Sequence, residues 1–472
     1  MSGKTADSAQ AVPGGAASVK LTFRQRFDYA IFDFGYMFVY YWVNAFMSVY
    51  YTEVIGVSVT AVATLTLVVR IFDAVNDPII GSIADRSNSP KGKYTPWLRW
   101  GGLAMGIFIM MMFAARPSWS MGMKLVWMWT TYTLVTVATT CHYMPYMALN
   151  GVISADSGER NKASALRGVF CGASGQLSAM LAVPLITVIA GTDTGPEAAN
   201  GYTGAVAICA VIFIAIAFYT SGRVKEVVKQ PPSQKKVPFF ENIRLFLKNK
   251  YAVVLAIGFL MNGFCQFGRM AIVLYYFQYV GGDIGLNTTY GLVTLIACLV
   301  GPGFVTEWMY KLTKHKGRGM VLGFALYGML SAPLYFMTPG TLAFWVVLFL
   351  GQMITAAASG IASGMVGDAA DYGEYISGVR TDGFISSVLS LMQKIGSAVG
   401  PALMLLVIDH YGFVSNAASQ SPEVLNVLSF GMSFAMSICS VVAVINYLIY
   451  DLSDEKLAGI RQKIELRHAA GK

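Results

Sequence analysis

The stretch Arg70-Ile-Phe-Asp73-Ala-Val-Asn76-Asp77-Pro78 places charged side chains inside an apolar segment that runs from roughly residue 58 to residue 83. A helix advances about 100° per residue, so Asp73 and Asp77 lie one turn apart, with Asn76 and Arg70 on the same polar stripe. A charge at the centre of a membrane helix costs about 2.5–3.5 kcal/mol on insertion scales. Two carboxylates on one buried face therefore need a positive partner, either Arg70 or a bound cation. We predict a cation site; a purely structural Arg–Asp network is the alternative.

The composition is that of an integral membrane protein. Hydrophobic residues make up 55% of the 472 residues and charged residues only 12%, whereas soluble domains carry about 25% charged residues. The six cysteines lie within apolar stretches without metal-site spacing, and the four histidines are scattered, so we expect no zinc site. The net charge of +9 concentrates in alternate loops and does not indicate a nucleic-acid partner.

Segments long enough to span a bilayer follow one another along the chain. They cover approximately residues 28–53, 58–84, 98–115, 123–152, 165–190, 202–222, 251–280, 288–312, 319–337, 341–370, 383–410 and 425–450. We therefore predict an all-α membrane protein with twelve transmembrane helices in two six-helix bundles. The expected parts are a tail at 1–27, a bundle at 28–222, a central loop at 223–250, a second bundle at 251–450 and a tail at 451–472.

The basic loops predict the orientation. The central loop carries eight lysines and arginines, and the loops on the same side carry Arg86, Arg99, Arg160, Lys162 and Lys316 among others. By the positive-inside rule this side is cytoplasmic, as are both termini. We expect a multi-pass protein of the inner or plasma membrane that acts as a monomer in the lipid bilayer. For the tail that begins at Ser453, the sequence predicts either an amphipathic helix on the membrane surface or a solvated terminal helix.

Three blocks of sequence, together with the six-plus-six layout, resemble the glycoside–pentoside–hexuronide:cation symporter family within the major facilitator superfamily. The first block joins Tyr50-Tyr-Thr-Glu-Val-Ile-Gly-Val-Ser to Arg70-x-x-Asp73-Ala-x-Asn76-Asp77-Pro and Lys91-Gly-Lys-Tyr-Thr-Pro96-Trp97. The second is Tyr275-Tyr-Phe-x-Tyr279-Val. The third runs from Asp368-x-x-Asp371-Tyr372-Gly-Glu374-Tyr through Gly378-Val-Arg380, with Lys394 in the next helix. The resemblance covers essentially the whole chain and implies two bundles rocking about a site at the membrane midplane.

The resemblance implies a coupling-cation site. In the family, the acidic pair on the second helix, a neighbouring Asn and a Thr on the fourth helix hold the cation, and the matching residues of this chain are Asp73, Asn76, Asp77 and Thr140. Oxygen ligands suit a hard cation such as Na⁺. Paired carboxylates also disfavour double ionisation, so H⁺ fits the same geometry, and Li⁺ stays open as well. No cofactor and no other metal is expected.

Two basic residues match family positions that lie near the substrate. Lys394 has a family counterpart that faces the central cavity near the cation site, so we assign it to coupling and count it among the substrate-binding candidates. A lysine that snorkels from a helix end is the alternative. Arg167, at the start of the fifth segment, matches a family position close to sugar, and a positive-inside anchor is its alternative.

Acidic residues where the tenth segment meets the cytoplasm predict an inner gate. Asp368, Asp371 and Glu374 recur every third residue beside Tyr372. With Arg380 and the Arg160–Lys162 loop they could form charge pairs that break between states; a solvated helix end is the alternative. Gly81 to Pro96 resembles the superfamily's hairpin between helices two and three, braced by Asp85 and Arg86.

The substrate positions depart from the family's melibiose-binding pattern. Where that pattern has carboxylates and tryptophans, this chain has Met37, Tyr143, Met147 and Ser359. A galactoside substrate is thereby disfavoured. Aromatic residues such as Tyr40 and Tyr143 take their place as candidates to stack on a sugar, with helix packing as the alternative.

Arg269 is a buried cation with no acidic residue within one turn. It needs an anion from elsewhere. We consider Asp33, in Phe32-Asp33-Phe34-Gly35, or a substrate carboxylate, which leaves a hexuronide open. A structural salt bridge between the halves is the alternative, and Asp33 is counted with the coupling residues.

These observations predict a cation-coupled symporter that imports a glycoside or related sugar by alternating access, and not an enzyme. No Walker A motif occurs, so ATP-driven pumping has no support in the sequence. A transporter of amphiphiles such as lysolipids, an uncoupled sugar facilitator, and a receptor or enzyme on the same scaffold are the rivals.

Overall fold

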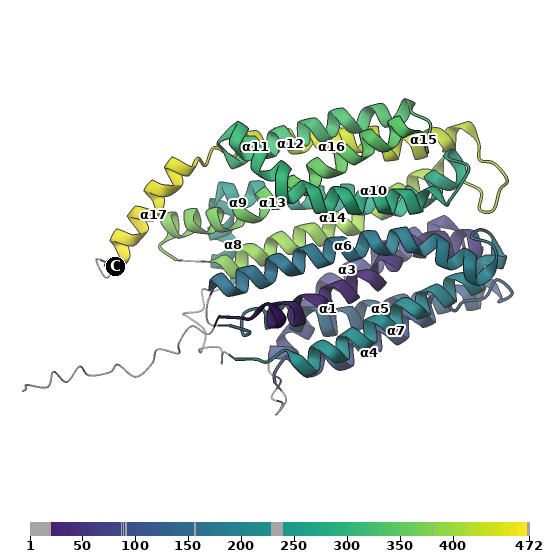
Figure 1. Ribbon diagram of the computed structural model, residues 1–472, viewed down its shortest axis with the longest axis horizontal. Coiled ribbons are helices and arrows are strands. Elements are labelled where there is room, and N and C mark those ends of the chain that lie inside the picture. The colour runs from purple at the N-terminus through teal and green to yellow at the C-terminus, as the bar shows by residue number, and fades with distance from the viewer. Residues whose placement is uncertain are drawn as a thin grey trace, which may run out of the picture.

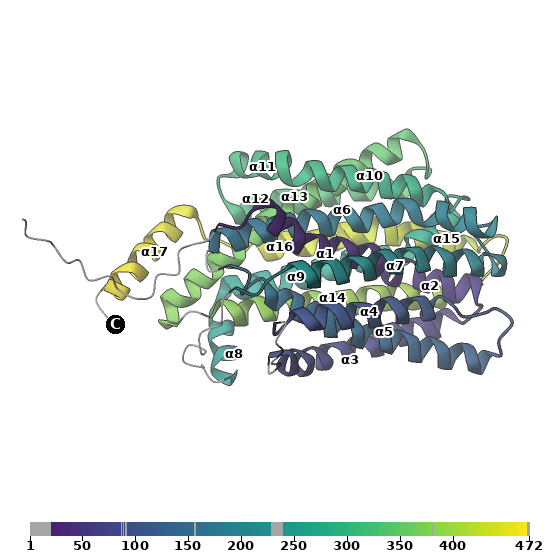
Figure 2. The same cartoon turned by 60° about the horizontal axis from the view of Figure 1, so that its bottom comes forward.

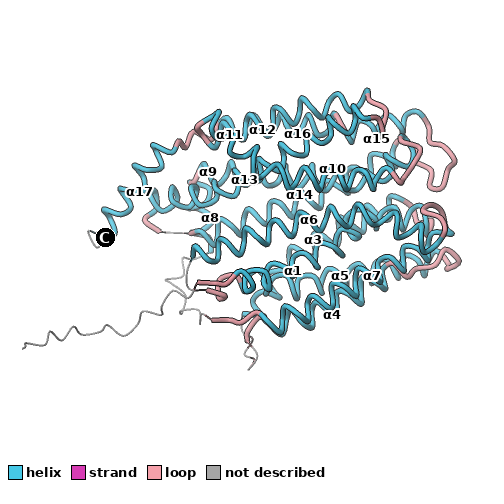
Figure 3. The backbone as a smooth tube through the Cα atoms, viewed as in Figure 1, coloured by secondary structure: helices cyan, strands magenta, loops and turns pink. Residues whose placement is uncertain are grey.

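The computed structural model describes residues 20–85, 87, 89, 92–154, 157–227, 239–379 and 381–469, and within these ranges every regular element is a helix. Figure 1 shows long helices side by side in two layers, with α1 to α7 in one and most of α9 to α16 in the other. Figure 2 shows the same rods from a second direction, and Figure 3 shows that the loops gather at the two ends. The predicted all-α fold class is confirmed.

The first half of the chain forms six rods. The first is α1 (Phe23–Tyr41), which continues through η1 (Trp42–Phe46), α2 (Met47–Val49) and η2 (Tyr50–Val54). The others are α3 (Val59–Asp85), α4 (Thr95–Met112), α5 (Met121–Leu149), α6 (Ser157–Ala190) and, after η3 (Pro196–Ala198), α7 (Ala199–Arg223). Side-chain caps begin several of them: Thr22 accepts from the Gln25 backbone, and Ser120 accepts from that of Met123.

The second half begins with α8 (Phe239–Lys248), a short helix in the segment expected to be a loop, and forms six more rods. These are α9 (Lys250–Tyr275) with η4 (Tyr276–Val280); α10 (Leu286–Val300) with η5 (Gly301–Val305) and α11 (Thr306–Thr313); α12 (Lys316–Ser331) with η6 (Ala332–Phe336); α13 (Leu342–Ser377); α14 (Asp382–His410); and α15 (Pro422–Met432) with α16 (Phe434–Leu448). The chain ends in α17 (Asp454–Ala469).

Within the described residues, seven helices are long and apolar enough to cross a membrane, judged by length and composition. They are Lys162–Ala190, Pro196–Arg223, Lys250–Val280, Lys316–Phe336, Leu342–Ser377, Gly383–His410 and Pro422–Leu448. Helix α3 carries Arg70, Asp73 and Asp77 along its length.

Glycines let α9 and α14 approach at backbone contact, which fixes the depth of the charged residues that they carry. A Cβ at Gly396 would lie 2.2 Å from the Leu260 carbonyl oxygen, and one at Gly400 would lie 2.3 Å from that of Phe264. Small residues at a helix crossing are typical of packing in lipid, where backbones approach closely. Helix α14 also packs against α3, and α6 packs against α10, so these pairs form the seam between the two halves.

The two ends of the molecule differ in charge. We call the end that holds the start of α1, residues 92–94 and 150–154, α8 and α17 the basic end, and the other the opposite end. In Figure 1, α17 lies at the left, at the basic end, beyond the rods. The tail therefore folds into the predicted helix, and this helix contacts α13. Arg461 pairs with Asp371 of α13, and Arg467 donates to the Tyr375 carbonyl oxygen at 2.6 Å.

Candidate functional site

The carboxylates of Asp73 and Asp77 meet the ammonium of Lys394 at the seam between α3 and α14. The Lys394 Nζ lies 3.3 Å from Asp73 Oδ2 and also pairs with Asp77 Oδ2. These three residues come from two halves of the chain, more than 300 positions apart. The positive group that buried carboxylates require is therefore a lysine from the other half.

Thr140 and Asn76 complete the polar cluster from two sides. The Thr140 hydroxyl on α5 lies 3.1 Å from Asp73 Oδ1 and 3.1 Å from Asp77 Oδ1. Asn76 is buried, and its Nδ2 has no hydrogen-bond partner. The structure thus brings Thr140 within hydrogen-bonding distance of both predicted carboxylate ligands, and Asn76 lies on the same helix between the two aspartates.

Arg70 does not form the Arg–Asp network that is the alternative interpretation of the polar stripe. Its Nη2 donates to Asn44 Oδ1 on η1 at 2.8 Å, and its Nε is buried without a partner. Arg70 points toward the first helix, whereas Asp73 and Asp77, about one and two turns further along, point toward α5 and α14. The residue that bridges both carboxylates is Lys394.

A cavity of about 1060 Å³ lies between α6 of the first half and α9, α10, α12, α13 and α16 of the second. Its wall mixes polar side chains with small and apolar ones, and its charged lining residues in the described chain are Arg167 and Arg269. Amide and hydroxyl groups also line the cavity. They belong to Gln176, Asn262, Gln266, Thr294, Gln352 and Thr355. Groups of this kind bind sugar hydroxyls by hydrogen bonds.

Arg167 lies on this wall with a partner. Its Nε is 3.6 Å from Asp33 Oδ2, and the Asp33 side chain is almost fully buried. The hypothesis that Asp33 supplies the anion for Arg269 is therefore wrong, because Asp33 of α1 faces α6 within its own half.

Arg269 has a different environment. Its Nη1 donates to the Tyr327 hydroxyl at 2.9 Å, and its guanidinium carbon lies 5.8 Å from the Tyr290 ring centroid. Its Nε and Nη2 are buried without hydrogen-bond partners, and no carboxylate of the described chain pairs with it. The alternative of a salt bridge between the halves is not observed in the described residues.

Tyr40 and Tyr143 lie outside the residues that line this cavity. Both stack on Tyr36, with ring centroids 5.0 Å and 4.6 Å apart, and Tyr36 itself is buried. In this conformation their rings serve helix packing in the first half, which is the alternative interpretation. Lys394 is likewise absent from the lining and belongs to the carboxylate cluster.

The acidic run on α13 pairs within its own half. Asp368 meets Lys316 of α12 and, at 3.5 Å, Arg461 of α17; Asp371 meets Arg461 at 2.7 Å. Tyr372 packs edge-on against Tyr251, with centroids 4.6 Å apart, and Glu374 is buried. Among the residues that the structure describes, the predicted pairing of this run with the Arg160–Lys162 loop is not observed. Arg160 and Lys162 lie in the first turns of α6 and not in a loop. There, Arg160 donates to the Ser154 carbonyl oxygen at 2.9 Å, and Lys162 pairs with Glu159.

Some predicted gate residues lie beyond what the structure describes. Arg86 and Arg380 fall outside the described residues, and Asp85 is the last residue of α3 with no described side chain. Their roles in the hairpin and in the inner gate stay predictions.

Sequence reasoning missed a cluster at the opposite end, around Glu53. Glu53 is 1% exposed, and its Oε2 accepts from the Tyr279 hydroxyl and from the Asn416 backbone N–H at 2.9 Å. One residue earlier, the Thr52 and Tyr275 hydroxyls are 2.7 Å apart. The signal was present, because an acid ends the first apolar segment and Tyr279 lies in one of the blocks that carry the resemblance.

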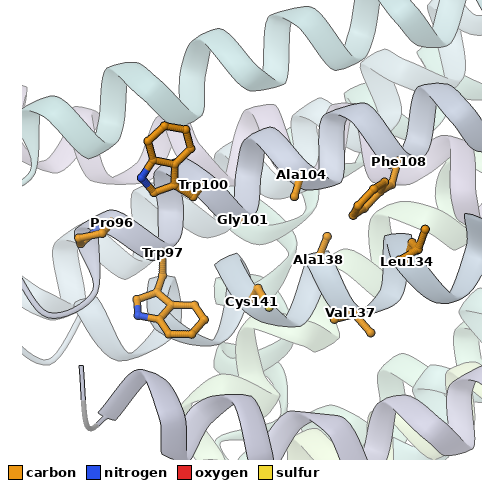
Figure 4. A pocket seen from close by; sticks show the side chains of 10 residues that line it. All are labelled: Pro96, Trp97, Trp100, Gly101, Ala104, Phe108, Leu134, Val137, Ala138 and Cys141. Carbon is orange, nitrogen blue, oxygen red and sulfur yellow. The ribbon is translucent and has the colours of Figure 1, made fainter. Parts of the chain in front are cut away.

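A second cavity, of about 380 Å³, lies between α4 and α5. Figure 4 shows Trp97 and Trp100 on α4 at one end and Phe108 and Leu134 at the other, with no charged side chain among those that line it. A cavity of this composition offers no charged group that would bind an ion, and its aromatic rings could only stack on a ligand, so the large cavity and the carboxylate cluster are the candidate site.

Comparison with known proteins gives a family for this arrangement. The model of the family described as MFS/sugar transport protein matches residues 28–454. The inner membrane symporter YicJ of Escherichia coli (strain K12) is 27% identical over 450 residues, which cover 94% of this chain and 95% of that protein. The isoprimeverose transporter of Lactiplantibacillus pentosus is 28% identical over 455 residues, covering 93% and 91%.

Solved structures agree on the fold. A bacterial homologue of the human lysosomal transporter Spinster, in an inward-facing and unoccupied conformation, superposes with a TM-score of 0.65 at 14% identity, covering 93% of this chain and 99% of that one. The predictions of the major facilitator fold, of cation-coupled sugar symport and of a transporter instead of an enzyme are thereby supported, with a multi-pass location in the membrane. The chain belongs to the MFS/sugar transport protein family of membrane transporters.

Proposed function

We propose that the chain imports a glycoside or related sugar together with a cation, by alternating access of two halves formed by residues 28–222 and 251–450. The single observation that carries this proposal is the cluster at the seam, where Thr140 and Lys394 meet the carboxylates of Asp73 and Asp77. A site that joins two halves and holds mobile charge is suited to couple ion binding to the rocking of those halves.

The ligands favour a small hard cation. Asp73, Asp77, Thr140 and Asn76 supply only carboxylate, hydroxyl and amide oxygens, which suit Na⁺. In this arrangement the Lys394 ammonium occupies the same oxygens, so an arriving Na⁺ displaces it. Protonation of one carboxylate would release the ammonium too, so H⁺ is the second candidate for the coupling ion.

The cavity supports a polar cargo. Its lining carries two arginines, three glutamines and several hydroxyl groups, which suit sugar hydroxyls. A sugar transporter among the relatives, named for isoprimeverose, supports the same class. We place the basic end in the cytoplasm by the positive-inside rule, so that both termini are cytoplasmic, and we expect a monomer.

The test uses purified protein in lipid vesicles with an imposed Na⁺ or H⁺ gradient and labelled isoprimeverose or a labelled glucoside as probe. We expect accumulation only with the coupling gradient, to which the membrane potential adds about 2.3 kcal/mol per charge per 100 mV. Asp77→Asn should abolish accumulation. Asp193→Asn, in the loop between α6 and α7, is the matched control and should leave it unchanged.

Two outcomes would count against the proposal. Equal uptake with and without ion gradients would make the protein an uncoupled facilitator. Full accumulation by Asp77→Asn would remove the cluster from the coupling mechanism, even if the sugar itself is transported.

A further inference from the structure

Two arginines line the large cavity, and their charges are not equally balanced. Arg167 has Asp33 at 3.6 Å, whereas Arg269 has no carboxylate partner in the described chain. The described lining residues include no aspartate or glutamate. The cavity therefore carries one positive charge that the described residues do not neutralise, in a part of the molecule where an uncompensated charge is costly.

The guanidinium of Arg269 is arranged for a particular kind of anion. Nη1 is already occupied by the Tyr327 hydroxyl at 2.9 Å. The unpartnered atoms are Nε and Nη2, which lie on one edge of the planar group and point their N–H bonds in parallel. Two parallel donors match the two oxygens of a carboxylate, or two of the three oxygens of a sulfonate.

The surroundings hold Arg269 in place. Its side chain is 4% exposed, the Tyr290 ring lies against the guanidinium, and α9 is fixed by its close contact with α14. Leaving a buried donor without a partner costs about 1–3 kcal/mol. Two such donors belong to this one side chain on the wall of a cavity. A ligand anion that reaches this edge of the guanidinium would satisfy both donors and the charge. Arg70 and Arg167 each leave only Nε unpartnered, whereas Arg269 leaves two nitrogens and its charge unmatched.

We propose that Arg269 is the specificity-determining residue of the substrate site and selects a glycoside that carries an anionic group, a carboxylate or a sulfonate. The proposal rests on the proposed sugar transport and adds the charge of the cargo to it. The sugar hydroxyls would meet the amide and hydroxyl groups of Gln176, Gln352 and Thr355 on the same wall.

The experiment compares glycosides that differ in one group. The probes are methyl glucuronide, with a carboxylate at C6; methyl glucoside, with a hydroxymethyl group there; and the corresponding glucoside with a C6 sulfonate. Binding to the purified full-length protein is measured by thermal stabilisation and by calorimetry. We expect at least one anionic probe to bind the wild type about 10- to 100-fold more tightly than the neutral one.

Arg269→Gln should remove that preference and leave the binding of methyl glucoside within about twofold, since only the charged contact is lost. Arg269→Lys should restore part of it, because the charge returns without the planar fork. Arg116→Gln, an arginine at the opposite end that donates to Asn200, is the control and should behave as wild type. Which anion binds more tightly tells the carboxylate from the sulfonate.

The proposal is overturned if the wild type binds methyl glucoside as tightly as both anionic probes, or if Arg269→Gln weakens neutral and anionic probes alike. It is also overturned if neither acid binds at all. Gradient-driven uptake of a neutral sugar that Asp77→Asn abolishes would, in any of these cases, leave the proposed symport intact. If gradient-driven uptake of a neutral sugar also fails, the proposed function itself is contradicted.

Discussion

The two ends of the bundle hold their polar contacts in opposite ways. At the opposite end, contacts cross between the halves: Glu53 meets Tyr279 and Asn416, and Thr60 on α3 donates to Asp409 on α14 at 2.5 Å. At the basic end, the ion pairs among the described residues stay within one half. Arg26 pairs with Glu159 at 2.6 Å, and Lys316 and Arg461 meet the acidic run on α13.

The difference identifies which end is closed in this structure. Buried polar contacts that cross the seam hold two bodies together, whereas pairs within one body move with it. The structure thus has its halves joined at the opposite end by these contacts, in addition to the bridge between Lys394 and the two aspartates deeper in the seam. Opening that end requires breaking the contacts of Glu53, and closing the basic end requires new partners across the seam. Substitutions at the two ends, and then salt, test this contrast in order of decreasing expected effect.

Replacing Glu53 should have the largest effect, because it removes the acceptor for two donors at once. Hydrogen bonds to a charged group contribute about 1.5–3 kcal/mol each, so Glu53→Ala should shift the balance between states by roughly 3 kcal/mol or more toward an open opposite end. The separation of spin labels at Ser118 and Ser419, both exposed at that end, measures the change.

Glu197→Ala offers a matched control for this change, since Glu197 is an exposed acid at the same end. It should leave the label separation as in the wild type. An unchanged distance distribution in Glu53→Ala would show that the contacts around Glu53 do not hold the halves together.

Tyr279→Phe should have a smaller effect of the same sign. The hydroxyl is lost, but Glu53 keeps the Asn416 N–H and the phenyl ring keeps its contact with Phe413. We expect a shift of about 1.5–3 kcal/mol, read from the same pair of labels. Tyr411→Phe, which changes an exposed ring nearby, is the control. A larger shift than that of Glu53→Ala would contradict the assignment of Glu53 as the shared acceptor.

At the basic end, Arg461→Ala should change stability only slightly. The Arg461 side chain is 54% exposed, and ion pairs at such positions contribute about 0–1 kcal/mol. We expect a small fall in melting temperature and wild-type rates of transport. Lys463→Ala, two residues further along α17, serves for comparison. Complete loss of transport would show that α17 acts as part of the gate.

Raising the salt concentration should affect the polar contacts of the two ends differently, and this should be the smallest of the expected effects. Raising the ionic strength from about 0.05 M to about 1 M shortens the screening length to about 3 Å, which weakens exposed pairs and spares buried ones. Hydrogen exchange should therefore accelerate in α17 and stay constant in η2 and η4. Equal acceleration at both ends would show that the contacts of Glu53 are as open to solvent as those of Arg461.

Much of this arrangement follows from local pattern. The all-helical fold could be predicted from apolar length, and the cluster of Asp73, Asp77 and Thr140 from helical spacing together with the resemblance. Hydropathy alone predicts where the rods lie along the sequence. A segment that crosses the bilayer must satisfy its backbone hydrogen bonds internally, and an apolar helix does so.

The partners across the bundle could not be read from spacing, since they depend on which faces meet. Comparing how far each residue lies along its helix would nonetheless have corrected the hypothesis that Asp33 pairs with Arg269. Asp33 and Arg167 each lie ten residues from the start of their helix at the basic end, whereas Arg269 lies nineteen residues into α9. At about 1.5 Å per residue, Asp33 matches the depth of Arg167 and not that of Arg269.

The bridge between Lys394 and the two aspartates has a consequence for the unloaded carrier. In the proposed symport, this tethered ammonium would take the place of the transported ion, so that the empty protein could return across the bilayer without exposing two bare negative charges. We expect Lys394→Met to keep exchange of one bound solute for another while losing net uptake, because only the empty return step needs the substitute. A side chain that never leaves the protein would then decide whether the empty carrier can complete the cycle, while the gradients set its direction.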